Sequence, residues 1–150
     1  MSNEEPSITF EVSGRSVTIT HPDRVLWPED GLTKLDLVNY FLKIAPLILP
    51  HIVDRPLTLK PYAEGIHGPF FYTHNAPRSA PAWVKTTTFR TLTEPGKVIH
   101  PVLANDVATL AWLANRAVIE IHAWLSRADD LARPDLVVFD LDPGKRVPFS

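Results

Sequence analysis

Cysteine is absent from this 150-residue sequence, and neither sign of charge dominates it. Without thiols the chain can form neither disulfides nor thiolate metal sites, which fits a reducing compartment. It has 15 basic and 17 acidic residues, a net charge of −2, so nucleic-acid binding would need a local cluster of cations. No apolar run reaches the ~18 residues of a membrane span, and the acidic first residues lack the apolar core of a signal peptide. We therefore expect a cytoplasmic protein without a membrane partner.

Alternating apolar and polar residues, helix caps and scattered prolines predict an α+β fold with a small mixed or antiparallel sheet flanked by helices. Thr33 and Asp36 form a capping box for one helix, and Asn105 or Asp106 caps a second that ends near residue 115. Pro46 and Pro50 should divide the residues that follow this helix into short helical turns. Strands are expected at residues 8–12, 16–20, 56–61, 118–122 and 136–139. We treat residues 1–150 as one domain because no linker divides them.

Two aspartates follow the last apolar run, at Asp140 and Asp142. If residues 136–139 form a buried strand, alternation would point both carboxylates to the same side of its carboxyl end. Carboxylate oxygens suit a hard divalent cation, Mg²⁺ or Mn²⁺, as in phosphoryl and nucleotidyl transfer. An ordinary strand-end turn is the alternative, because Asp and Pro are common turn residues.

Seven segments in order resemble one family, the polymerase/primase domain of bacterial DNA ligase D, within the archaeo-eukaryotic primase superfamily. They are HPDRVLWP at 21–28, GLTK at 31–34, RPLTLK at 55–60, NAP at 75–77, ATLAWLAN at 108–115, IEIHAWLSR at 119–127 and FDLDP at 139–143. The resemblance implies the N-terminal half of a primase-type polymerase fold.

The family activity would be template-directed nucleotidyl transfer in non-homologous end joining. The resemblance implies DNA ends with a 5′-phosphate as the main partner, nucleoside triphosphates as substrates of a completed enzyme, and Ku and ligase as further partners. Mn²⁺ or Mg²⁺ would be the cofactor. The protein would act in the bacterial or archaeal cytoplasm, associated with the nucleoid.

By the same resemblance, Asp140 and Asp142 would be two of three metal-binding carboxylates, and His122 would lie in the active site near the nucleotide phosphates. Arg24 and Lys34 would hold the 5′-phosphate. Lys34 also lies in the first turn of its helix, where free N–H groups should favour an anion.

Lys60 would contact nucleotide or DNA phosphates, and an aromatic pair within Phe70, Phe71 and Tyr72 would stack on a template base. The alignment leaves two pairs open, Phe70 with Phe71 and Phe71 with Tyr72. Each of these residues could instead be an ordinary core or surface side chain.

The sequence also departs from the family. His74 and Pro61 stand where the family commonly has basic residues, which should weaken DNA affinity. No Asp or Glu follows Asp142, so a third carboxylate is missing. Three hypotheses remain: part of a nucleotidyltransferase, a catalytically incomplete module that binds DNA ends through the 5′-phosphate, or a protein-interaction domain.

Overall fold

A computed structural model describes residues 5–91, 94–142 and 144. The strands are β1 (Ser7–Val12), β2 (Arg15–Thr20), β3 (Val25–Trp27), β4 (Leu32–Thr33), β5 (Leu57–Pro61), β6 (Lys85–Thr86), β7 (Phe89–Arg90), β8 (Val98–Ile99), β9 (Val102–Leu103) and β10 (Val118–Ala123). The helices are α1 (Lys34–Ile52) and α2 (Val107–Asn115). The predicted α+β class is confirmed, and every strand pairing in the described part is antiparallel.

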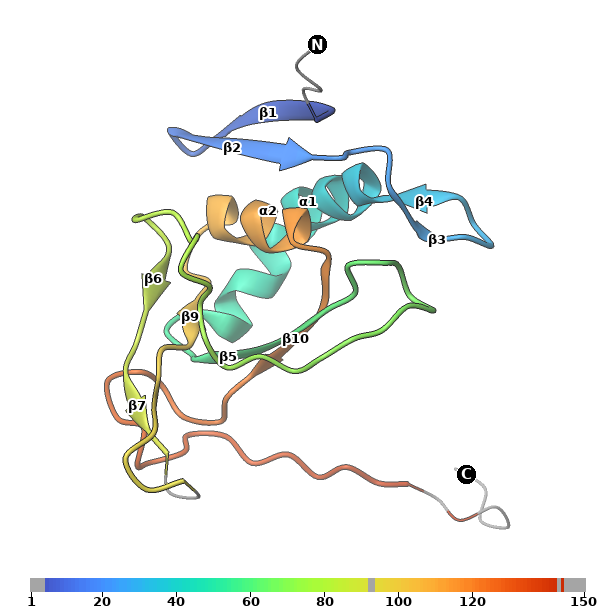
Figure 1. Cartoon of the computed structure of the whole chain (residues 1–150). Coiled ribbons are helices and arrows are strands. Elements are labelled where there is room, and N and C mark those ends of the chain that lie inside the picture. Colours follow the sequence, from blue (N-terminus) through green and yellow to red (C-terminus); the bar gives the residue numbers. More distant parts are fainter. Residues whose placement is uncertain (1–4, 92–93, 143, 145–150) are drawn as a thin grey trace.

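The two helices form a layer between a hairpin and a four-stranded sheet (Figure 1). The hairpin is β1 and β2, and the sheet has the order β10-β5-β9-β6. Helix α2 contacts α1, β2 and β10, and its side chains from Ala108 to Ala114 are all buried. The core therefore lies around α2, and the turn after α2 emerges between the hairpin and the sheet.

The first two strands and both helix starts form where the sequence predicts them. Ser13 and Gly14 join β1 to β2 with φ angles of 50° and 75°, the left-handed pair that a two-residue turn between twisted strands requires. Thr33 caps α1 because its side-chain hydroxyl accepts a hydrogen bond from the Asp36 N–H. The Asp36 carboxylate in turn accepts one from the Thr33 N–H. Asp106 caps α2 and pairs with Arg15 of the hairpin at 2.5 Å, which fixes the hairpin to the helix layer.

The predicted break of the first helix is wrong, because α1 continues through Pro46 and Pro50 to Ile52. A proline in a helix interior removes one hydrogen bond and costs about 3 kcal/mol. Here both prolines face outward, while Ala45 and Ile52 are buried in the core on either side of them. Tertiary packing of that buried face outweighs the local cost.

By length and composition alone, α1 could cross a membrane. Such a helix is weak evidence for a membrane span, because the core helices of globular proteins pass the same test. Leu37, Val38 and Phe41 of α1 belong to the hydrophobic core that it shares with α2. Packing inside this domain thus explains the apolar character of the buried face of α1.

The predicted strand at residues 136–139 is also wrong for the described chain. These residues pair with no described strand, and their side chains are exposed, with Phe139 at 79%. The segment runs along one side of the molecule toward the C-terminus (Figure 1). An apolar run becomes a strand only when another strand satisfies its backbone hydrogen bonds, and none in the described part does so.

Candidate nucleic-acid interface

A polar pocket of about 220 Å³ lies where the loop after β2, the start of α1 and the end of α2 meet. We call it the basic pocket. It is lined by Thr20, Arg24, Lys34, Ala63, Asn115, Arg116 and Ala117. Three of these described residues are cations and none is a carboxylate. The structure therefore brings Arg24 and Lys34, predicted together, into one site.

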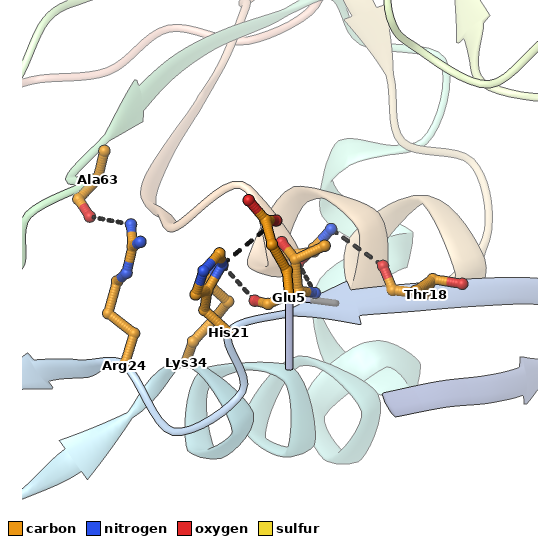
Figure 2. Close-up of polar contacts among 8 residues, drawn as sticks. Glu5, Thr18, His21, Arg24, Lys34 and Ala63 are labelled. Carbon is orange, nitrogen blue, oxygen red and sulfur yellow. Dashed lines mark hydrogen bonds and ion pairs between the residues drawn. The ribbon is translucent and has the colours of Figure 1, made fainter. Parts of the chain in front are cut away.

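Lys34 lines this pocket although its side chain is buried. The residue is 4% exposed, and its Nζ donates a hydrogen bond of 2.6 Å to the Thr20 carbonyl (Figure 2). Burial, and then the positive charge of Arg24, lower the pKa of Lys34 below its ordinary value, while Glu5 opposes the shift. A buried cation beside a second cation is stabilised by a bound anion, which offsets both effects.

The expectation that free N–H groups of α1 assist this site is wrong. The Lys34 N–H donates to the Arg24 carbonyl at 2.8 Å, and the Leu35 N–H donates to Pro22 at 2.9 Å. The Asp36 N–H is taken by the Thr33 cap. These first-turn donors are used by the protein itself, so the side chains carry any affinity for an anion.

Arg24 and Asn115 complete the geometry. The Arg24 Nη1 donates to the Ala63 carbonyl at 3.1 Å, and the side chain projects from its loop toward that carbonyl (Figure 2). The Asn115 amide ties the end of α2 to β2, because its Oδ1 accepts from the Thr20 N–H at 2.9 Å and its Nδ2 donates to Thr18. The polar lining is thus held by contacts between elements distant in sequence.

A second polar cluster lies on strands β5 and β10, around Lys60 and Glu120. Antiparallel register places the two residues opposite each other, and Lys60 Nζ lies 2.7 Å from Glu120 Oε1. The Tyr62 hydroxyl also donates to that oxygen. The hydrogen bond to Glu120, and then that to Tyr62, raise the pKa of Lys60 above its ordinary value.

Aromatic rings surround the same ammonium group. Lys60 Nζ lies 4.2 Å from the ring centre of Phe70, 5.2 Å from Tyr62 and 5.4 Å from Tyr72. These distances are those of cation–π contacts. Lys60, predicted to contact phosphate, is engaged in this structure by one carboxylate and three rings.

The aromatic segment 70–72 divides between two faces. Phe70 and Tyr72 are in edge contact at 6.2 Å on the Lys60 side, whereas Phe71 lines a separate pocket of about 230 Å³. We call it the Phe71 pocket; its lining is Leu59, Pro61, Phe71, Thr73, Asn75, Ala76, Pro77, Arg116 and Val118. Phe70 and Tyr72 share a cluster from which Phe71 is separate, and all three are more than half exposed. The base-stacking role stays a prediction.

His122 lies on β10, as predicted, with its side chain 49% exposed. Its Nε2 is 3.3 Å from the second carboxylate oxygen of Glu120, and its ring is 5.8 Å from that of Tyr72. His122 and Glu120 are two residues apart on one strand and therefore share a face. Glu120 thus links His122 to Lys60, although sequence reasoning had singled out only the two basic residues.

The Glu120→Gln variant should lower the pKa of Lys60 toward that of an ordinary lysine, because it removes the charged acceptor that stabilises the ammonium. An NMR titration that follows the methylene next to Lys60 Nζ measures this. The matched control is Glu11→Gln, an exposed carboxylate on β1, which should leave the titration unchanged. An unaltered Lys60 pKa in Glu120→Gln would show that the rings alone hold the cation.

Asp140 and Asp142 are exposed on the C-terminal segment. The segment is anchored just before them: Asp135 accepts from the buried Arg55 at 2.7 and 2.9 Å and from Arg127 at 3.0 Å. Within the described residues, no group of three or more His, Cys, Asp or Glu side chains could hold a metal ion. Two carboxylates match the chemistry of Mg²⁺ or Mn²⁺, but they do not by themselves complete a site.

Sequence reasoning missed Glu120, Tyr62 and Arg116. Alternation on the strand could have placed Glu120 beside His122, since the two residues are separated by one. Nothing local marks Arg116, because the other two cations of the basic pocket, Arg24 and Lys34, lie far from it in the sequence. These partners depend on how distant segments meet.

Comparisons with known proteins show which family this chain belongs to. Residues 33–150 match the family described as LigD, primase-polymerase domain. The chain is 35% identical over 136 residues to the multifunctional non-homologous end joining protein LigD of Mycolicibacterium smegmatis, covering 89% of this chain and 18% of that protein. It is 32% identical to the Pseudomonas aeruginosa LigD, of which it covers 16%. The chain thus spans less than a fifth of these relatives.

A solved structure is similar over most of the fold. The polymerase domain from Mycobacterium tuberculosis ligase D in complex with DNA superimposes with a TM-score of 0.69 at 32% identity. The match covers 74% of this chain and 38% of that one. On the sequence and structural matches together, this chain belongs to the LigD primase-polymerase domain family.

Proposed function

We propose that this chain binds DNA ends in non-homologous end joining and recognises a 5′-phosphate in the basic pocket. The observation that carries the proposal is the pocket itself, in which Arg24, Lys34 and Arg116 surround a polar hollow. Lysine and arginine side chains are ordinary surface cations in most proteins. Here Lys34 is buried, and it shares a pocket with Arg24. The DNA-bound structure of the M. tuberculosis ligase D polymerase domain supports the same partner.

Recognition would combine a phosphate contact with weaker, sequence-independent contacts. Cations hold phosphate by charge-assisted hydrogen bonds, and exposed rings such as Phe71 can stack on any base. The net charge of −2 gives no long-range attraction, so affinity should depend on these local contacts and fall as salt rises.

The test compares binding of the 150-residue chain to two recessed DNA duplexes that differ only in a 5′-phosphate or 5′-hydroxyl at the recessed end. Fluorescence anisotropy at low salt should show roughly tenfold to a hundredfold tighter binding of the phosphorylated duplex, because hydrogen bonds to a charged group contribute about 1.5–3 kcal/mol. Equal affinity for both duplexes would overturn the proposal. Absence of any DNA binding at low salt would favour a protein-interaction domain instead.

Nucleotidyl transfer with nucleoside triphosphates is a second proposed function, supported by family membership and by the presence of Asp140 and Asp142 in the matched region. Mn²⁺ or Mg²⁺ would supply Lewis-acid stabilisation of the reacting phosphate. Because the described residues bring no third ligand to the two aspartates, no catalytic step is assigned to them. Ku, ligase and a cytoplasmic, nucleoid-associated location are proposed on family grounds alone.

A further inference from the structure

We infer that Arg116 is a third cationic ligand of the 5′-phosphate, beside Arg24 and Lys34 in the basic pocket. This inference rests on the proposed function of the basic pocket. It adds a residue that the resemblance to the family did not point to.

The backbone around Arg116 is fixed on both sides. Arg116 caps the C-terminus of α2, and its N–H donates to the Leu113 carbonyl at 3.0 Å. The next residue, Ala117, has a φ of 53°, a left-handed conformation that non-glycine residues adopt only where contacts hold it. The Ala117 N–H donates to Ala114 at 2.8 Å, and its carbonyl accepts from Tyr62 at 2.9 Å. This turn holds Arg116 at the junction of α2 and β10.

The charge on Arg116 is not neutralised by the protein. Within residues 5–91, 94–142 and 144, its guanidinium forms no ion pair, and its one charge-related contact is with the Trp112 ring at 5.6 Å. By contrast, Arg15 pairs with Asp106, and Arg55 pairs with Asp135. Partial burial lowers the pKa of Arg116 below its ordinary value. An anion in the basic pocket would satisfy its donors.

Arg116 also lines the Phe71 pocket, so it forms a wall between a basic site and a mainly apolar one. A nucleotide presents the same pair of properties, a charged phosphate next to a sugar and a flat base. With the phosphate beside Lys34, the rest of the terminal nucleotide could extend past Arg116 toward Phe71. The two pockets thus fit a 5′-terminal nucleotide better than a free phosphate ion.

The experiment measures anisotropy binding of the 5′-phosphate and 5′-hydroxyl recessed duplexes to the wild-type chain and to Arg116→Gln. We expect the variant to bind the phosphorylated duplex about tenfold more weakly, as for one charge-assisted hydrogen bond, and the hydroxyl duplex as before. Arg90→Gln is the matched control, because Arg90 is exposed on β7 and outside both pockets. It should keep the wild-type preference.

The outcomes separate this inference from the proposed function. If the wild-type chain shows no 5′-phosphate preference, the proposed function fails and the inference fails with it. If the wild type shows the preference and Arg116→Gln retains it, only the inference is overturned. An equal loss of affinity for both duplexes in Arg116→Gln would overturn the inference as well, because Arg116 would then contact the DNA backbone in general and not the 5′-phosphate. Arg116 is exposed, so the variant should fold, and its thermal unfolding midpoint checks this.

Discussion

Replacing Lys34 by methionine is expected to weaken binding of 5′-phosphorylated recessed DNA by roughly tenfold to a hundredfold and to abolish the preference over the 5′-hydroxyl duplex. A hydrogen bond to a charged group contributes about 1.5–3 kcal/mol, and each 1.4 kcal/mol is a factor of ten. Lys34 should approach the upper end, because its ammonium is only partly solvated and its neighbour Arg24 adds to the same field.

Anisotropy titrations of the two duplexes measure this change. Methionine keeps the apolar stem of Lys34, so the buried volume is largely preserved, although the Thr20 carbonyl loses its donor. Lys43→Met is the matched control, since Lys43 is exposed on α1 away from the basic pocket. If a folded Lys34→Met variant still prefers the 5′-phosphate, Lys34 does not bind that phosphate.

Because the pKa of Lys34 is lowered, the preference for the 5′-phosphate should depend on pH. The groups that act on it are Arg24, Glu5 and the burial of its own ammonium. As pH rises through the folded-state pKa, below the ordinary lysine value, the ammonium is lost and the phosphate preference should decline. The Lys34 contribution to folding stability should rise over that window, because the unfolded chain then binds more protons than the folded one. Lys34→Arg should keep the preference to higher pH.

The second large effect concerns stability. Leu110→Ala should lower the free energy of unfolding by about 3 kcal/mol, because a fully buried leucine would leave a cavity that its neighbours fill only in part. Leu110 lies in α2, the helix that contacts α1, β2 and β10 and delivers Asn115 and Arg116 to the basic pocket. Weaker packing of α2 should therefore also weaken 5′-phosphate recognition at temperatures near the unfolding midpoint.

Urea unfolding followed by tryptophan fluorescence measures the change. Leu47→Ala is the matched control, because Leu47 is 73% exposed on α1 and the same side-chain truncation there leaves no cavity. Its effect should stay within about 0.5 kcal/mol. Equal losses in the two variants would contradict the view that α2 is the centre of the core.

The parts of the fold that could be predicted from sequence are those whose hydrogen bonds close locally. The Thr33 capping box joins residues three positions apart, and the Ser13-Gly14 turn needs only its own φ angles. The two wrong predictions about the fold depend on contacts between residues distant in the sequence. Pro46 did not end α1, because the core holds the helix on both sides of it, and residues 136–139 did not form a strand, because no described strand pairs with them.

The same division applies to the candidate site. By itself, the sequence determined the capping residues and the position of β10, and its ordered motifs singled out Arg24, Lys34, Lys60 and His122 as candidate site residues. Only the tertiary structure decided that Lys34 is buried, that its helix N–H groups are already used, and that Arg116 joins the basic pocket. A motif specifies which side chains are present, whereas charge neutralisation, burial and shared pockets arise only when segments distant in sequence come into contact.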